Sequence, residues 1–364
     1  MLLYLYQKLI QMKKINKLFF KKKSMPLDSF LDKVLYHRNF GYYQNKNPFG
    51  EKGDFVTAPN ISNLFGEMIT IWIVSFWEKL KKPKKINFIE MGPGNGDLCL
   101  SILQTLKNFP HVYKSFNIML YERSEILRKI QRKRISSKKV TWIKNLKVIT
   151  DGPVIFFGNE FLDALPIKQF KKINGILFEK YVEINKNNVS FFFKKLIKKE
   201  IKKLKNFKVT KNNVIIEYPE HGFRELELVC KKIKELNGGA LFIDYGYIKE
   251  NNFDTLQSVI KHKFNDIRQN VGKADITSLV NFNLYKKYFN MKNLSVDRII
   301  SQSEFLQKLG IMERCKILSN SLDNKDKSNL YGRVKRLIHP KMMGENFKVI
   351  FAKNKKCNFT IDLN

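Results

Sequence analysis

The segment FIEMGPGNGDLCL, residues 88–100, decides the fold. Apolar residues lead into the acid Glu90, three glycines follow at alternate positions, and the next apolar stretch suits a helix. Glycine adopts positive φ angles at little cost, and the N-terminus of a helix presents backbone N–H groups to a ligand. Gly92, Gly94 and Gly96 therefore predict a tight turn from a strand into a helix, with a ligand lying against bare backbone.

Strand and helix patterns alternate on both sides of this turn. Helices are predicted at residues 26–38, 61–83, 97–109 and 123–135. Strands are predicted at residues 86–92, 116–122, 153–160, 238–246 and 344–354. The alternation predicts an α/β fold with a doubly wound, mostly parallel sheet that the last strand closes.

Composition distinguishes several parts of the chain. The predicted parts are a basic extension that we expect to be disordered (1–25), N-terminal helices with the GDFVTAP loop (26–83), a sheet core (84–166 and 217–354), a β-hairpin insertion (167–216) and a helical and loop insertion (247–294). The extension partly resembles a transit peptide but contains no arginine. Its apolar runs are shorter than the roughly 18 residues that span a bilayer, so we expect no transmembrane segment.

The net charge of +35 comes almost entirely from lysine, since only 11 of the 68 basic residues are arginine. This composition is typical of an AT-rich genome and favours a diffuse coat of solvated lysines; a functional surface for a polyanion is the alternative. We therefore expect no specific nucleic-acid partner. The four cysteines are far apart and lack metal-binding spacing, which predicts reduced thiols and no metal site: Cys99, Cys230, Cys315 and Cys357.

The residues around the glycines narrow the choice of ligand. A dinucleotide-binding turn has the pattern G-x-G-x-x-G, whereas this chain has E-x-G-x-G-x-G from Glu90 to Gly96. An acid at the end of the strand would repel a pyrophosphate, but it suits the α-amino cation of S-adenosylmethionine. Glu122, at the end of the next predicted strand, is placed to accept hydrogen bonds from the ribose hydroxyls. These features predict an S-adenosylmethionine site.

Nine motifs follow one another in order between residues 26 and 354. They are GYY (41–43), FGEKGDFVTAP (49–59), FGEM (65–68), EMGPGNGDL (90–98), NEFLDALP (159–166), IDYG (243–246), DTLQ (254–257), GKADIT (272–277) and MMGENFKV (342–349). Together they resemble the MidA-like family of class I methyltransferases, which includes mitochondrial complex I assembly-factor arginine methyltransferases and bacterial relatives. One departure lies at residues 95–97, where the family commonly has Arg-Gly-Thr and this chain has Asn-Gly-Asp.

The resemblance implies methyl transfer from S-adenosylmethionine to an arginine of a protein, in the eukaryotic case a subunit of complex I. An arginine guanidinium stays protonated, so carboxylates must hold it. The predicted catalytic residues are Asn159 and Glu160, at the carboxyl end of a strand, and Asp163 shortly after them. Both acids also have a structural interpretation, because a negative charge at a helix N-terminus stabilises the helix.

Cofactor contacts are predicted at Glu90, Gly92, Gly94, Gly96, Glu122, Asp54 and Thr57. The last two belong to the GDFVTAP loop, for which turn and N-cap roles are the structural alternative. Aromatic residues in and near this loop suit a lid that excludes water over the cofactor: Tyr42, Tyr43, Phe49 and Phe55.

Two other functions stay open on the sequence. One is methyl transfer to a small molecule or another nucleophile, and the other is a non-catalytic assembly factor that binds S-adenosylmethionine and docks onto a respiratory complex. We expect a cytoplasmic protein in a bacterium, or a protein of the mitochondrial matrix in a eukaryote.

Overall fold

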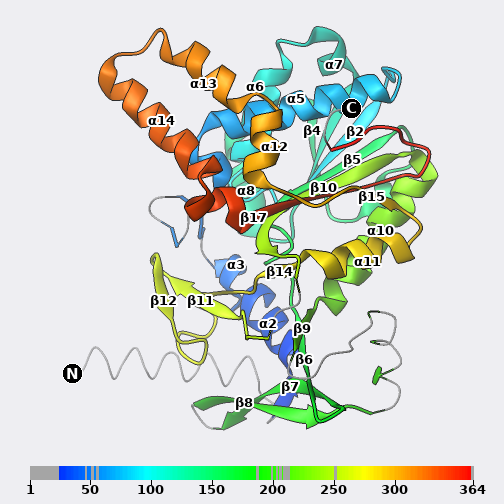
Figure 1. The fold of residues 1–364 in the computed structure, drawn as a ribbon, viewed down its shortest axis with the longest axis vertical. Helices are drawn as coiled ribbons and strands as arrows, with labels where there is room; N and C mark the ends of the chain where they lie inside the picture. The colour runs from blue at the N-terminus through cyan, green and yellow to red at the C-terminus, as the bar shows by residue number, and fades with distance from the viewer. Residues whose placement is uncertain are drawn as a thin grey trace.

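A nine-stranded sheet forms the centre of the molecule (Figure 1). The computed structural model describes residues 24–45, 47–50, 53–54, 57–185, 188–197, 200–201, 204, 207, 214–249 and 252–361. The strand order is β15-β17-β10-β5-β2-β3-β4, with β14 beside β10 and β16 beside β17. The strands are β2 (Ile86–Met91), β3 (Phe116–Tyr121), β4 (Val140–Ile143), β5 (Val154–Asn159), β10 (Gly238–Tyr247), β14 (Val280–Asn281), β15 (Ser295–Val296), β16 (Ile300–Ser301) and β17 (Phe347–Lys353).

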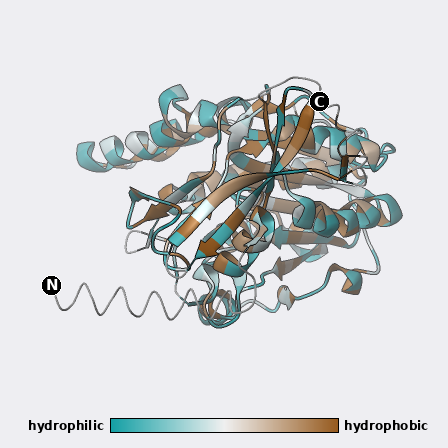
Figure 2. Ribbon diagram, turned by 90° about the horizontal axis from the view of Figure 1, so that it is seen from below, coloured by the Kyte–Doolittle hydropathy of each residue, from teal (hydrophilic) through white to brown (hydrophobic). Residues whose placement is uncertain are grey.

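The pairing directions confirm the predicted doubly wound sheet. Strands β4, β3, β2, β5 and β10 run parallel to one another, and β17 pairs antiparallel with β10. All five strands expected from the sequence are present, while the four-residue β4 was not predicted. The two strands β2 and β5 are almost completely buried, and Figure 2 shows the sheet as a brown centre between helices with teal outer faces.

Helices cover both faces of this sheet, as its apolar runs require. One face packs against α5, α6, α12 and α14 in a cluster that includes Phe88 and Phe157, and the other packs against α10 and α11 around Phe156 and Phe242. The helices are α2 (Leu27–Tyr36), α3 (Tyr42–Asn45), α4 (Ala58–Ile61), α5 (Asn63–Lys79), α6 (Asp97–Leu106), α7 (Pro110–Ser115), α8 (Glu125–Arg134), α10 (Glu220–Leu236), α11 (Phe282–Met291), α12 (Gln302–Lys308), α13 (Ile311–Ser319) and α14 (Asn324–Ile338), with short turns η1 (Leu146–Val148) and η2 (Pro340–Gly344).

A second sheet lies beside the central one and has the order β1-β7-β6-β9, with β8 also paired to β7. Its strands are β1 (Ser24–Pro26), β6 (Lys168–Ile173), β7 (Ile176–Asn185), β8 (Asn188–Lys195) and β9 (Ile215–Tyr218), and we call it the insertion sheet. Residues 24 and 25, which the sequence analysis gave to the N-terminal extension, instead form part of β1. Met25 buries its side chain against α2, which explains the difference. Residues 1–23 lie outside the described part of the chain.

Residues 247–294, expected to be helix and loop, contain helix α11 but also a small third sheet that was not predicted. Strands β11 (Gln257–Ile260), β12 (Lys263–Asn265) and β13 (Asp275–Thr277) precede α11, and β11 lies in the middle. These strands have three or four residues and carry many polar side chains, so their alternation was too short to detect. We refer to them as the three-stranded sheet.

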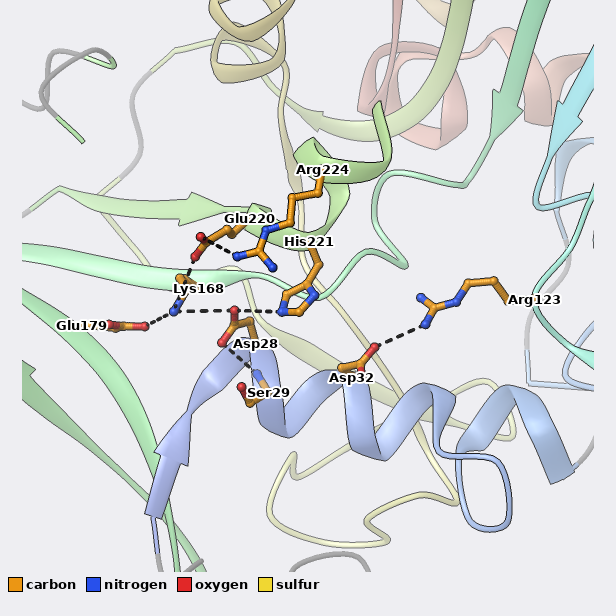
Figure 3. A network of polar contacts seen from close by, with 9 residues as sticks. All are labelled: Asp28, Ser29, Asp32, Arg123, Lys168, Glu179, Glu220, His221 and Arg224. Carbon is orange, nitrogen blue, oxygen red and sulfur yellow. Dashed lines mark hydrogen bonds and ion pairs between the residues drawn. The ribbon is translucent and has the colours of Figure 1, made fainter. Parts of the chain in front are cut away.

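A network of ion pairs fixes α2 between the insertion sheet and α10 (Figure 3). The ammonium of Lys168 lies 2.7 Å from Glu179 Oε1, 3.6 Å from Asp28 Oδ2 and 3.8 Å from Glu220 Oε2. On the other side of Asp28, the carboxylate lies 3.4 Å from His221 Nε2. The Lys168 side chain is only 14% exposed, so its charge is a structural counterion for three carboxylates.

We expect Lys168→Met to lower the free energy of unfolding by about 3 kcal/mol, because it removes a cation from the buried carboxylates of Glu179 and Asp28. Urea denaturation measures the change. The control is Lys85→Met: Lys85 pairs with Asp151 at the surface, where both side chains are at least half exposed, and should cost less than about 1 kcal/mol. Equal effects of the two substitutions would show that the network does not stabilise the fold.

Candidate active site

The predicted glycine turn connects β2 to α6. Gly92, Gly94 and Gly96 have φ angles of 70°, 52° and 82°, in the left-handed region that residues with a β-carbon rarely adopt. Gly96 is the N-cap of α6, whose first residue is Asp97. The turn therefore presents backbone rather than side chains beside the end of β2.

Two adjoining cavities meet at this turn and share Phe49, Gly92, Gly94 and Glu160 in their walls. The smaller cavity is also lined by Thr57, Asn60, Glu90, Asp97 and Asn159. The larger cavity extends past the end of β3 and reaches the three-stranded sheet; its polar lining includes Tyr36, Tyr43, Glu122, Arg123, Asp163, Tyr245 and Asp275.

Glu90 and Glu122 are buried acids on either side of the turn. Burial, followed by the charges of Asp97 and Glu122, raises the pKa of Glu90 to about 8. Its Oε2 atom is buried and has no hydrogen-bond partner among the described residues. Burial also raises the pKa of Glu122 to about 7, although the backbone N–H of Ser124 donates to its Oε1 over 2.7 Å.

The end of β5 places Asn159 and Glu160 between the two cavities. Glu160 has a φ of 52°, and an exception of this kind at a non-glycine residue is typical of functional sites. Its Oε1 accepts hydrogen bonds from the Asn159 amide at 3.1 Å and the Ala58 N–H at 3.4 Å. Burial and then the charge of Asp163 raise the pKa of Glu160 to about 8. Asn159 Oδ1 is buried without a partner in the described chain.

Asp163 lies in an irregular segment after β5. The hydroxyl of Tyr245 donates to its Oδ2, while its Oδ1 is buried and has no partner among the described residues. Burial raises the pKa of Asp163 above its usual range. Asp244 holds this segment in place, since its Oδ2 accepts the backbone N–H groups of Leu162 and Asp163 at 2.8 and 3.1 Å.

This segment also decides between two interpretations of its acids. No helix occurs in the fully described stretch between β5 and β6, so neither Glu160 nor Asp163 is a helix-terminal charge. The interpretation of Glu160 and Asp163 as charges that stabilise a helix N-terminus, which the sequence also allowed, is therefore wrong.

The two cofactor contacts predicted in the GDFVTAP loop, Asp54 and Thr57, lie in different places relative to the cavities. Thr57 is the N-cap of α4, in a capping box with Asn60, and it also lines the smaller cavity. Asp54 lines neither cavity; its carboxylate accepts the Tyr42 hydroxyl at 2.6 Å and the Lys261 N–H at 2.8 Å. Asp54 thus joins the N-terminal segment to the three-stranded sheet. Of the proposed lid aromatics, Tyr43 and Phe49 line a cavity, Tyr42 does not, and Phe55 lies outside the described residues.

Sequence reasoning missed Asp275, Tyr36 and Arg123 as cavity residues. Asp275 belongs to the quoted GKADIT motif, but nothing in that motif indicates where its strand packs. The guanidinium of Arg123 lies 4.4 Å from the centre of the Tyr36 ring and 3.5 Å from Asp32 Oδ1. This contact links α2 to the turn that carries Glu122.

A family model of S-adenosyl-L-methionine-dependent methyltransferases matches residues 68–300. The chain belongs to this family. The match confirms the family resemblance that the motifs indicated. It also confirms the predicted methyltransferase fold and the predicted cofactor, S-adenosylmethionine. Among the described residues, no helix is long and apolar enough to cross a membrane.

Individual relatives match most of the chain. The mitochondrial protein arginine methyltransferase NDUFAF7 of Xenopus laevis is 28% identical over 92% of this chain and 83% of its own length. The human protein of the same name is 29% identical over 92% of this chain and 81% of its length. A crystal structure from Burkholderia thailandensis with S-adenosylhomocysteine bound has a TM-score of 0.81 and 22% identity, covering 99% of this chain and 95% of that one. It has the same fold.

The residues at the glycine turn fit S-adenosylmethionine. Its sulfonium carries an electrophilic methyl group, and its amino acid end carries a cation. Glu90, buried with an unpartnered oxygen, would hold that amino group, and Glu122 would accept the ribose hydroxyls. These roles stay predictions, as do the backbone contacts of the three glycines.

We expect the affinity for S-adenosylhomocysteine to rise between pH 6 and 8.5. Burial raises the pKa values of Glu90 and Glu122 to about 8 and about 7, so below these values the carboxyls carry protons that the ligand must displace. Each proton released makes affinity change by up to about tenfold per pH unit. Calorimetry across this range measures it, and Glu90→Gln should flatten the upper part of the curve. A flat curve for the wild-type protein would contradict the assignment.

We also expect Gly94→Val to abolish binding of S-adenosylhomocysteine without unfolding the protein. A valine at a φ of 52° is strained, and its side chain would project toward the ring of Phe49, 3.4 Å from the position of a β-carbon. Gly332→Val is the control, because a β-carbon on Gly332 in α14 meets no atom within 4 Å. Calorimetry with circular dichroism separates the two outcomes, and unchanged affinity in Gly94→Val would refute the site.

Proposed function

We propose that this protein transfers the methyl group of S-adenosylmethionine to an arginine side chain of a protein. The acidity of the larger cavity carries the proposal. In a chain of net charge +35, the described lining of this cavity contains four carboxyl groups and one basic side chain. That base, Arg123, already pairs with Asp32. The remaining carboxyl groups can take on negative charge beside a bound cation, which suits a cationic acceptor.

Glu160 is the residue best placed to act on the acceptor. Among the described residues, the two hydrogen bonds to Glu160 both fall on Oε1, so Oε2 is the oxygen left for a guanidinium. A guanidinium keeps its proton in water, and it must lose one when a nitrogen gains a methyl group. A carboxyl whose pKa burial raises to about 8 is suited to accept that proton near neutral pH.

The relatives support the same acceptor, because their names describe protein arginine methyltransferases. We further propose that the substrate protein is a subunit of complex I. This part of the proposal rests on the resemblance to the complex I assembly-factor methyltransferases. We also propose a location: the mitochondrial matrix in a eukaryote, since the eukaryotic relatives are named mitochondrial, or the cytoplasm in a bacterium.

Incubation with labelled S-adenosylmethionine and a cell lysate, followed by complete acid hydrolysis of the protein fraction, tests the function. The proposal requires label in methylarginine from one or a few proteins. Label in small molecules would favour a small-molecule methyltransferase. No transfer, with cofactor binding intact, would favour a docking role.

We expect Glu160→Gln to reduce methyl transfer by about 100-fold or more, the scale of losing one preorganised electrostatic partner. The glutamine keeps the shape of the side chain but removes its charge and its ability to accept the proton. Affinity for S-adenosylhomocysteine should change less than threefold, or by roughly 0.6 kcal/mol.

The control is Glu78→Gln at the exposed end of α5, whose side chain is 54% exposed. It should leave both turnover and cofactor affinity unchanged. Full turnover in Glu160→Gln on the identified protein substrate would remove Glu160 from the reaction.

A further inference from the structure

Asp275 is a cavity acid that comes from outside the methyltransferase sheet. It begins β13 of the three-stranded sheet, is 5% exposed, and lines the larger cavity together with Glu160 and Asp163. Burial, followed by the charge of Asp163, raises the pKa of Asp275 to about 7. Asp275 therefore adds a carboxyl from the three-stranded sheet to the cavity that Glu160 and Asp163, which follow β5, also line.

Tyrosine hydroxyls hold both of these carboxyls. The Tyr43 hydroxyl lies 3.1 and 3.3 Å from the two oxygens of Asp275, and the Ile276 N–H donates to Oδ1 at 3.0 Å. Tyr245 holds Asp163 in the same manner on Oδ2. Within the described chain neither acid has a basic partner in an ion pair, and Asp163 Oδ1 is buried without any partner.

We propose that Asp163 and Asp275 form a clamp that binds the acceptor guanidinium from two sides, with Tyr43 as the positioning residue of Asp275. The inference deepens the proposed function and rests on it. A guanidinium is a planar group with five N–H donors, so two carboxylates can each take donors from a different edge. An ammonium group is a point charge and does not match this arrangement, so the clamp selects arginine over lysine.

Tyr43 also connects the clamp to the cofactor end of the site. Its backbone carbonyl accepts the Ser124 hydroxyl at 2.6 Å, and the Ser124 N–H donates to Glu122. The N-terminal segment thus places Asp275 relative to the acid predicted to bind the ribose. Only the side-chain hydroxyl of Tyr43 reaches Asp275, so Tyr43→Phe removes one contact and leaves the backbone connection.

The test measures binding of two probes, N-acetyl-arginine amide and N-acetyl-lysine amide, to the protein saturated with S-adenosylhomocysteine. We expect the wild-type protein to bind the arginine probe at least tenfold more tightly than the lysine probe. Asp275→Asn should weaken arginine binding at least tenfold and reduce the discrimination. Tyr43→Phe should weaken it about threefold, and Asp275→Glu should restore part of it.

Controls separate a clamp from a structural role. Asparagine can keep the Ile276 and Tyr43 contacts, so Asp275→Asn should fold, and its affinity for S-adenosylhomocysteine should stay within twofold of the wild-type value. Asp266→Asn is the matched substitution in the same part of the chain, at a residue paired with Arg268, and should leave probe binding unchanged.

The clamp would be overturned if the wild-type protein and Asp275→Asn bound the arginine probe with equal affinity. Equal binding of both probes by the wild-type protein would do the same. The two proposals fail separately, because probe binding does not depend on turnover. If the protein binds the arginine probe selectively but forms no methylarginine, only the proposed enzyme function is contradicted. If Asp275→Asn forms methylarginine at the wild-type rate and with an unchanged KM, only the clamp is contradicted.

Discussion

Neighbouring parallel strands of the central sheet each carry an acid at their carboxyl end, and the rest of the structure is arranged around these groups. Glu90, Glu122, Glu160 and Asp244 come from β2, from the residue after β3, from the residue after β5, and from β10. Parallel strands end at the same edge of a sheet, so these acids meet there. Burial raises the pKa of all four.

The buried acids weaken the fold on its own. Since the pKa of Glu90 and Glu160 rises from 4.5 to about 8, the folded chain binds more protons than the unfolded chain between these pH values. The free energy of unfolding contributed by such groups therefore falls as the pH rises through that window. A bound cation reverses this effect, which is why an arrangement that costs stability is useful at a site for cationic ligands.

Local signals in the sequence predicted the part of the site built by the central sheet. Three alternate glycines indicated the turn after β2, and the strand patterns FNIMLYE (116–122) and PVIFFGNE (153–160) placed Glu122 and Glu160 at the ends of two further strands. The acid from the three-stranded sheet was beyond such reasoning, because Asp275 reaches the cavity through the packing of β13 and a contact with Tyr43, 232 positions away in sequence. The position of Asp54, which was predicted to contact the cofactor but lines neither cavity, was missed for a related reason, because its partner Lys261 lies 207 positions away in the chain.

The exterior of the protein is rich in positively charged lysine, whereas the larger cavity is lined by acidic side chains. Salt screens surface charges over about 8 Å at physiological ionic strength, so the lysine-rich exterior influences the approach of a partner, whereas the buried acids act only at contact. On the proposed function, a positive exterior favours encounter with an acidic protein, and the acidic cavity then selects a cationic side chain on it. An arginine within an acidic surface satisfies both conditions, and nucleic acid satisfies only the first. The lysine coat and the acidic cavity are thus compatible with one substrate.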